Sequence, residues 1–211
     1  FILFSVYIIF VALMNTIIVE GGKDMGNRIY PIGIQNFEKI RKEGYVYVDK
    51  TALMYKLVKS GSYFFLSRPR RFGKSLLIST LEAYFEAKRD LFEGLAVETL
   101  EKDWVKRPVF HLDLNIGKYD TPDSLDKILN ETLDYWESLY GTRSAETTLA
   151  LRFAGVVGRA YEQSGERVAI LIDEYDKPLL QAIGNEELQR EFRNTVKPFY
   201  GVLKTMDGCI K

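Results

Sequence analysis

The sequence holds one cysteine and one histidine in 211 residues, and these scarcities exclude several kinds of site. Cys209 alone cannot form an internal disulfide or a cysteine-based zinc site, and its isolation fits a reducing compartment. His111 alone leaves no conventional Ser-His-Asp set to spare for hydrolysis. Any chemistry therefore rests on other residue types.

Net charge is also lacking, because 29 Lys and Arg residues balance 29 Asp and Glu residues. A neutral chain creates no overall field that recruits nucleic acid or an anionic membrane, so anion binding has to be local. We find no internal repeat and no low-complexity segment. With 46% hydrophobic and 27% charged residues, the chain has the composition of a globular protein and the length of one α/β domain.

The chain has no initiator Met at position 1, and Phe1 to Val19 is almost wholly apolar. Three interpretations of this segment stay open: an N-terminal membrane anchor, a signal-like segment, or sequence upstream of a true start at Met25. The composition changes abruptly at Met25. We therefore divide the chain into an apolar leader, 1–24, and a domain, 25–211, and expect a cytoplasmic protein, or a membrane-anchored one if residues 1–19 are a real anchor.

A basic loop, Ser67 to Ser75, lies between an apolar segment with strand composition, Tyr63 to Leu66, and an apolar-periodic helix, Leu76 to Phe85. Gly73, Lys74 and Ser75 fill the last three positions of the phosphate-binding pattern G-x-x-x-x-G-K-[ST]. Arg68 stands where that pattern has its first Gly. In such loops backbone N–H groups and a helix N-terminus bind phosphate oxygens, so the loop indicates nucleotide binding.

A second signal is the continuous apolar run Val168 to Ile172, which ends in Asp173 and Glu174. Such a run is typical of a strand buried on both faces. A carboxylate at the carboxyl end of a parallel strand lies beside the phosphate loop. There Asp173 is placed to hold Mg²⁺ and Glu174 to polarise an attacking water.

The remaining pattern alternates strands with helices. Tyr45 to Val48 has strand composition, a helix is expected over Ala52 to Lys59, and Val109 to Asn115 alternates between apolar and polar residues. Further helices are expected over 125–140, 149–160, 179–183 and 188–196, with Pro198 near the end of the last one. Strands separated by helices predict βαβ units and a mainly parallel sheet.

Several polar residues are weaker candidates. Arg70 and Arg71 suit phosphate, an acidic side chain or a nucleic-acid backbone, and a solvated basic turn explains them equally well. Asp113 ends its strand where parallel sheets bind ligands, whereas His111 reads more as a hydrogen-bonded strand residue. Helix capping is enough to explain Asp49 and Thr51. A local ion pair explains Asp176 and Lys177, which we place outside the site.

Four segments resemble the bacterial AAA-ATPase-like family, and the likeness extends over nearly everything from Ile29 to Lys211. They are RPRRFGKS at Arg68–Ser75, GYVYVDKTALM at Gly44–Met54, HLDLN at His111–Asn115 and LIDEYDKPLL at Leu171–Leu180. The resemblance implies a P-loop NTPase three-layer sandwich that binds ATP and Mg²⁺. It implies catalytic roles for Lys74 and Glu174, Mg²⁺ ligation by Ser75 and Asp173, and nucleotide contacts by these residues: Arg70, Arg71, Phe72, Gly73, Lys74, Ser75 and Leu76.

Longer members of the family often carry a C-terminal nuclease-like domain of the PD-(D/E)XK type, so nucleic acid is a candidate partner through such a domain. Here Gly208 to Lys211 reads as the beginning of a further strand, one that this ATPase class inserts between the loop-bearing strand and the acidic strand. We therefore expect a domain that is incomplete at its C-terminal end and poorly stable alone, because each buried unpaired backbone group costs about 1 to 3 kcal/mol.

Two functions from different classes follow. The leading hypothesis is Mg²⁺-dependent ATP hydrolysis coupled to a conformational change, which requires little covalent work by the protein. The alternative is a nucleotide-sensing or DNA-associated regulatory module with little turnover, consistent with Arg68 at the Gly position. GTP is disfavoured because no Asn-Lys-x-Asp motif is present. The sequence leaves oligomerisation open.

Overall fold

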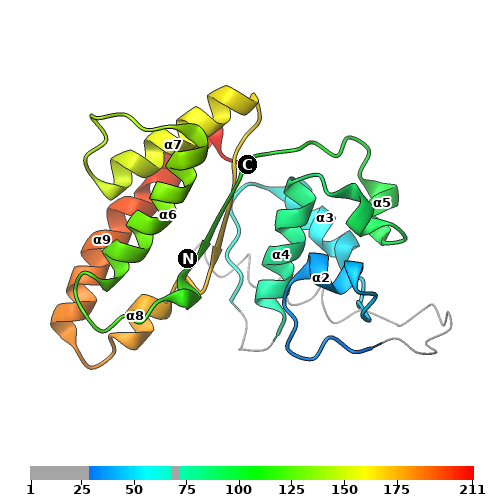
Figure 1. Cartoon of the computed structure of the whole chain (residues 1–211), viewed down its shortest axis with the longest axis horizontal. Helices are drawn as coiled ribbons and strands as arrows, with labels where there is room; N and C mark the ends of the chain where they lie inside the picture. The colour runs from blue at the N-terminus through cyan, green and yellow to red at the C-terminus, as the bar shows by residue number, and fades with distance from the viewer. Residues whose placement is uncertain (1–28, 68–71) are drawn as a thin grey trace.

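The computed structural model describes residues 29–67 and 72–211 (Figure 1). The apolar leader and Arg68, Arg70 and Arg71 lie outside the described residues, so the expectations placed on them stay predictions. Within the described part no helix is long and apolar enough to cross a membrane. The elements, in chain order, are α2 Phe37–Lys42, α3 Thr51–Ser60, α4 Lys74–Phe85, η1 Arg89–Phe92, α5 Ala96–Leu100, β1 Val109–Asp113, η2 Leu114–Ile116, α6 Ser124–Tyr140, α7 Leu149–Ser164, β2 Ala169–Asp173, α8 Lys177–Gln181, α9 Glu186–Thr205 and η3 Asp207–Cys209.

The sheet is small and parallel, which confirms an α/β fold. Strands β1 and β2 pair in a register that places Asp113 opposite Asp173. A further parallel bridge joins Val168 to Ile210 on the other edge of the β2 segment. There the Val168 N–H donates to the Cys209 carbonyl at 2.8 Å, and the Lys211 N–H donates to the Val168 carbonyl at 2.9 Å.

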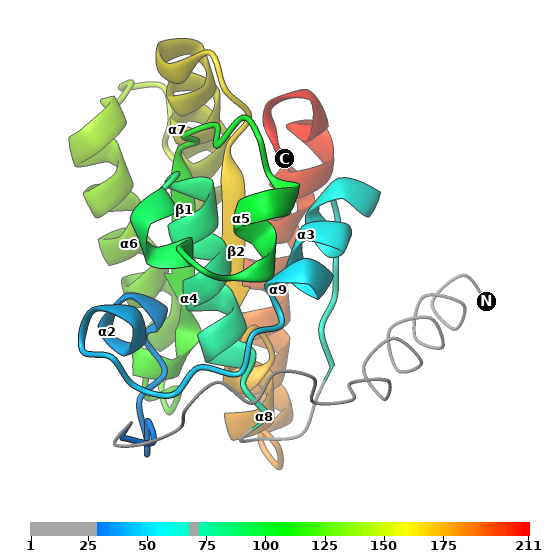
Figure 2. The same ribbon diagram turned by 90° about the vertical axis from the view of Figure 1, so that its right-hand side faces the viewer.

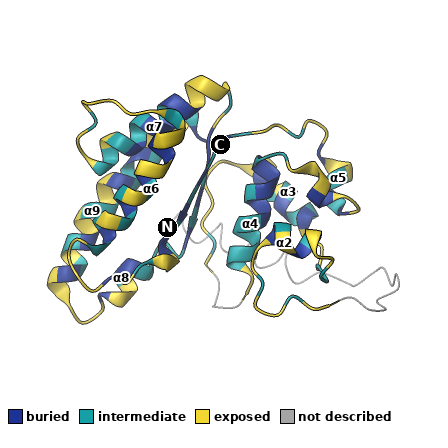
Figure 3. Cartoon of the chain, in the orientation of Figure 1, coloured by how far each residue is buried: buried dark blue, intermediate teal, exposed yellow. Residues whose placement is uncertain are grey.

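Helices cover both faces of this sheet. In Figure 1, α6 to α9 lie on one side of the strands and α2 to α5 on the other, and Figure 2 looks onto α4 with the strands behind it. The alternation of β1 and β2 divides the core accordingly. Phe110 and Leu112 pack with α6, α7 and α9, whereas Ala169 and Leu171 pack with α3 and α4 (Figure 3). The dark inner faces in Figure 3 are thus two separate apolar clusters.

The long helices form where local signals and burial agree. Helix α7 begins after Thr148, whose hydroxyl accepts from the Leu151 N–H, and ends at Gly165, which has φ +69°. Gly is suited to this left-handed position because it has no Cβ. Trp136 of α6 stacks on Phe110 of β1 with ring centroids 4.5 Å apart.

Two expected strands are wrong in the structure. Tyr45 to Val48 and Tyr63 to Leu66 form no ladder among the described residues. Tyr47 packs instead edge-on against Phe37, with centroids 5.1 Å apart. The Tyr63 hydroxyl bonds Leu203 and Asp207 at the far end of α9, and a cavity separates this segment from β2. A strand also needs the edge of a neighbouring strand to pair with, and composition alone does not provide one.

The end expected for the last helix near Pro198 is also wrong. Helix α9 runs from Glu186 to Thr205 with Pro198 inside it. Pro lacks an N–H and usually ends or bends a helix. Phe192 before it and Phe199 after it are both buried on the same core, so packing holds the two halves in line.

Candidate functional site

The candidate site begins at Gly73, the residue before helix α4. Gly73 has φ +74° and caps the helix without any side-chain hydrogen bond to the first turn. The Leu77 N–H donates to the Gly73 carbonyl at 3.0 Å. The first N–H groups of any helix lack intrahelical acceptors and carry a partial positive charge, so this end of α4 suits an anion.

The acidic end of β2 lies opposite. The Asp173 carboxyl group is 7% exposed, and its Oδ1 accepts from the Glu174 N–H at 3.0 Å. Glu174 has φ +50°, a left-handed conformation that costs a non-Gly residue free energy. Backbone strain of this kind often marks functional sites. The turn directs the Glu174 side chain toward α4, where it contacts Lys74.

Lys74 and Glu174 meet across the site. The Lys74 Nζ lies 3.8 Å from the Glu174 Oε1, with the two side chains 22% and 26% exposed. This separation is too long for a hydrogen bond. No other described residue forms a hydrogen bond or ion pair with the Lys74 ammonium group, so it suits an anionic ligand. Both residues line a cavity of about 470 Å³ that also includes Gly73, Ser75 and Leu76. The structure thus brings the basic loop end and the acidic strand end to one place.

The same cavity contains four polar residues that the sequence reasoning did not place there: Gln35, Asn115, Lys177 and Gln181. The sequence predicts that Lys177 lies outside the site, in an ion pair with Asp176. Its Nζ instead contacts the Asn115 carbonyl and lies 3.0 Å from the Asn115 Oδ1. The signal for Asn115 was its place on the polar side of the alternating strand. The contact between Lys177 and Asn115 joins segments that are 62 residues apart, so no local sequence pattern predicts it.

Asp113 and Asp173 are register partners at the ends of β1 and β2. Asp113 Oδ1 accepts from the Asn115 N–H at 2.8 Å and so fixes η2. Asp173 lines a neighbouring groove, whereas Ser75 lines the cavity of Lys74. Over residues 29–67 and 72–211, no group of three or more His, Cys, Asp and Glu side chains is arranged to hold a metal.

His111 lies in β1, two residues before Asp113, and pairs with Glu82 of α4. The His111 Nδ1 is 3.4 Å from the Glu82 Oε2. Its hydrogen bond with Glu82, opposed by burial, raises the pKa of His111 above 6.5. The same hydrogen bond lowers the pKa of Glu82. The pair joins α4 to β1 and serves to hold the sheet against the helix that follows the loop.

Asp49 and Thr51 cap helix N-termini, as the sequence predicts, and in doing so they join α3 to α5. Asp49 Oδ1 accepts from the Thr51 N–H, and Asp49 Oδ2 accepts from the Ala96 N–H at 2.7 Å. The Thr51 Oγ1 accepts from the Val97 N–H at 3.1 Å. Lys50, the residue that precedes α3, makes no side-chain cap. These two residues therefore bind α3 to α5 and lie outside the cavity of Lys74.

Comparison with known proteins assigns the family. The family model described as "Predicted AAA-ATPase" matches residues 31–211. The chain belongs to this family. The match includes the Gly73 turn, Lys74, and the acidic end of β2, so all parts of the candidate site fall within the family's own region.

A relative of this predicted AAA-ATPase is known from Azotobacter chroococcum mcd 1, where it is described as "Uncharacterized protein in vnfD 5'region". The two sequences are 38% identical over 189 residues, which is 89% of this chain and 36% of the relative. The chain therefore spans about a third of that relative's length. No solved structure matches the chain.

Proposed function

We propose that this protein binds ATP together with Mg²⁺ and hydrolyses it, coupling the reaction to a conformational change. The observation that carries the proposal is the approach of Lys74 to Glu174 across a cavity that begins at the N-terminus of α4. Phosphoryl transfer requires positioned positive charge and an oriented water more than covalent chemistry by the protein. The membership in the predicted AAA-ATPase family supports the same activity.

Each residue has a role in this proposal. Lys74 neutralises charge on the terminal phosphates, while the backbone N–H groups after Gly73 bind phosphate oxygens. Glu174 accepts a hydrogen bond from the attacking water and orients it. Arg70, Arg71, Phe72 and Leu76 complete the nucleotide contacts.

The residues also suit a magnesium ion. Mg²⁺ in nucleotide sites takes few protein ligands and completes its shell with phosphate and water, so the Ser75 hydroxyl and the Asp173 carboxylate are a sufficient donor set. The ion would neutralise charge on the phosphate oxygens.

The finer architecture, a P-loop sandwich, is part of the proposal. A groove of about 450 Å³ runs along the open edge of β2, between that strand and the Tyr63–Leu66 segment. Ile170 and Ile172 present their backbone groups to this edge, because alternate residues of a parallel strand bond to opposite neighbours and the Ala169 N–H bonds toward β1. We propose that a strand continuing the direction of the Val168–Ile210 bridge fills this groove.

The open groove also favours the alternative function, a nucleotide sensor or DNA-associated regulator with little turnover. Among the described residues no strand pairs with β2 beside the Glu174 turn, so that carboxylate would be held less firmly. ATP would then still bind while its hydrolysis is slow. Nucleic acid, a further partner in this reading, would bind through another part of a longer protein.

The test measures ATP binding by calorimetry beside phosphate release, for the unmodified chain and Glu174→Gln. We expect the variant to bind ATP within about twofold of the unmodified chain and to release phosphate at least 100-fold more slowly, in line with the loss of a general base. Normal turnover by the variant would show that Glu174 is not the base. Tight binding without turnover by the unmodified chain would support the sensor instead.

A further inference from the structure

A second cavity lies at the amino ends of β1 and β2, the end of the sheet opposite the Lys74 cavity. It has a volume of about 490 Å³, and it is lined by the ends of α3, α4 and α7 and by the residues that lead into the two strands. In Figure 1 this end of the sheet lies near the chain end marked C, whereas α8, which lines the Lys74 cavity, lies at the other end of the strands. The two cavities share no residue. We call this second space the basic cavity.

Three cations reach the basic cavity from three neighbouring segments of the sheet. The Ala169 N–H donates to the Pro108 carbonyl at 2.9 Å, so the parallel register continues before β1 and β2 and brings Arg107 next to Arg167. Lys211 lies on the other side of the β2 segment, where its N–H bonds to the residue before that strand. All three side chains line the basic cavity. Like charges side by side on adjacent strands are destabilising, so this row of cations favours a bound anion.

Carboxylates of the same wall neutralise part of this charge. Arg107 pairs with Glu166 at 2.7 Å, and Lys59 at the end of α3 pairs with Glu101 at 3.0 Å. The Glu101 carboxylate also accepts from the backbone N–H groups of the two residues that follow it, at 2.9 and 3.1 Å. Asp103 is the third carboxylate, and it is exposed. Each of the two ion pairs therefore leaves the cations on the other side of the cavity uncompensated.

Those cations are Arg167 and Lys211. Neither of them forms an ion pair with another described residue. Burial, followed by repulsion from the other three cations of the wall, lowers the pKa of Lys211 below 10.5. A guanidinium and an ammonium group that line one space suit an oxyanion, because charge-assisted hydrogen bonds from Arg and Lys to phosphate oxygens are short and strong.

We propose that the basic cavity binds a phosphate dianion, either free or as the phosphomonoester of a small organic molecule, with Arg167 and Lys211 as its main contacts. The volume leaves room for an organic group beside the phosphate. The wall offers that group three aromatic side chains: Tyr84, Trp104 and Tyr161. The site is separate from the proposed ATP site and does not depend on it, because none of its residues lines the Lys74 cavity.

The experiment measures the binding of inorganic phosphate and of phenyl phosphate by calorimetry at constant ionic strength. Every protein carries Lys74→Ala, which removes the cation of the other cavity. The proteins are this variant alone and the same variant combined with Arg167→Gln, with Lys211→Gln or with the control Lys56→Gln. Lys56 is an exposed residue of α3 that lines neither cavity, so it controls for the loss of one positive charge. Urea unfolding checks that each protein is folded.

We expect Lys74→Ala to bind phosphate. Arg167→Gln and Lys211→Gln should each weaken that binding about tenfold, in line with the loss of one charge-assisted hydrogen bond, while Lys56→Gln leaves it unchanged. Tighter binding of phenyl phosphate would support the site with a phosphomonoester as its ligand, and equal binding of the two probes would support it with free phosphate. Failure of Lys74→Ala to bind either probe would overturn the site. Binding that persists unchanged in both Arg167→Gln and Lys211→Gln would overturn it too.

Discussion

Asp113 and Asp173 lie opposite each other as the last pair in the parallel register of β1 and β2. The chain turns after each of them toward the N-terminus of α4, through η2 on one side and the strained Glu174 turn on the other. This edge therefore collects Asn115, Glu174 and Lys177 around Lys74. Ligands of parallel α/β sheets bind at the carboxyl ends of the strands, and the candidate site obeys that rule.

The left-handed conformation of Glu174 predicts a gain in stability on substitution by Gly. A non-Gly residue at φ +50° loses about 1 kcal/mol relative to Gly, so Glu174→Gly should be about 1 kcal/mol more stable to urea than Glu174→Ala. Ala87, at φ +56° in the turn after α4, is the matched control, and Ala87→Gly should be stabilised by a similar amount. If Glu174→Gly proves less stable than Glu174→Ala, the strain assigned to this turn is absent.

The His111–Glu82 pair predicts a pH-dependent contribution to stability. The pKa of His111 in the folded state lies above 6.5. The stabilisation that His111 contributes is therefore complete below pH 6.5 and is lost as pH rises through the folded-state pKa. Glu82 has a pKa below 4.5 in the folded state. The stabilisation that Glu82 contributes is therefore present above pH 4.5 and is lost as pH falls through the folded-state pKa. Asp113 and Asp173 also raise the pKa of His111. The pair should therefore stabilise the fold most between pH 4.5 and 6.5.

His111 is the chain's one histidine, so its imidazole proton signals in an NMR titration need no assignment. We expect a midpoint above 6.5 in the unmodified protein and a lower midpoint in Glu82→Gln. Glu86→Gln, at the residue that follows α4, serves as the control and should move the midpoint little. A midpoint that is the same in Glu82→Gln and the unmodified protein would contradict the pairing.

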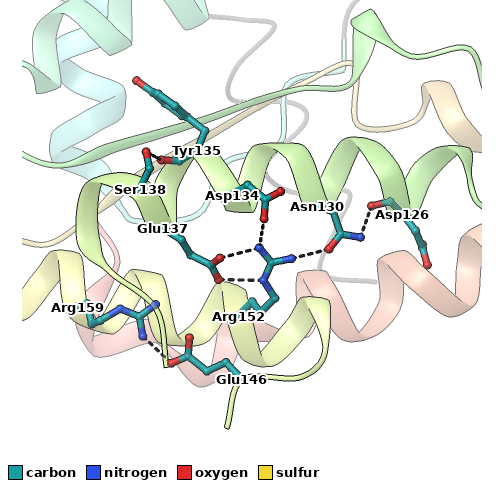
Figure 4. Close-up of polar contacts among 9 residues, drawn as sticks. All are labelled: Asp126, Asn130, Asp134, Tyr135, Glu137, Ser138, Glu146, Arg152 and Arg159. Carbon is teal, nitrogen blue, oxygen red and sulfur yellow. Dashed lines mark hydrogen bonds and ion pairs between the residues drawn. The ribbon is translucent and has the colours of Figure 1, made fainter. Parts of the chain in front are cut away.

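Truncation of Arg152 should lower the free energy of unfolding substantially, because this residue joins α7 to three residues of α6 (Figure 4). Its guanidinium donates to Glu137 at 2.9 and 2.6 Å, to Asp134 at 2.5 Å and to Asn130 at 2.5 Å. Glu137 is 7% exposed, so Arg152→Ala leaves a buried carboxylate unpaired and should cost about 3 to 5 kcal/mol in urea unfolding. Asp134 is 70% exposed, and Asp134→Ala should cost under about 1 kcal/mol. Equal costs for the two variants would refute this account of the network.

The open edge of β2 predicts that thermal unfolding of the chain is weakly cooperative. The groove beside Ile170 and Ile172 is lined largely by apolar side chains. We expect a broad calorimetric transition with a heat-capacity change below the roughly 2.5 to 3 kcal/mol/K typical of a well-packed chain of this length. A sharp two-state transition with the full heat-capacity change would contradict the account of an open edge at β2.

Local signals in the sequence were sufficient for part of the fold. The apolar run of β2 and the apolar periodicity of α6 and α7 each carry a complete local pattern, and the structure has all three elements. The pattern failed where a distant partner decides. Tyr63 to Leu66 has strand composition without a strand beside it, and burial of Phe192 and Phe199 overrides Pro198 in α9.

The site shows the same division. Gly73, Lys74 and Glu174 follow from motifs within a few residues of sequence, because a tight turn and a strand end each have a local signature. Asn115 and Lys177 reach the cavity through a contact between η2 and α8, which depends on how the chain folds back.

The most direct measurement of the central claim is Mg²⁺-dependent ATP binding to Lys74→Ala, followed by calorimetry beside the unmodified chain and Lys56→Ala. Lys56 is an exposed residue of α3 outside the Lys74 cavity, so it controls for the loss of one positive charge. We predict that Lys74→Ala binds ATP at least 100-fold more weakly while Lys56→Ala binds it normally. ATP binding of equal strength by Lys74→Ala and the unmodified chain would contradict the claim that Lys74 and Glu174 frame a nucleotide site.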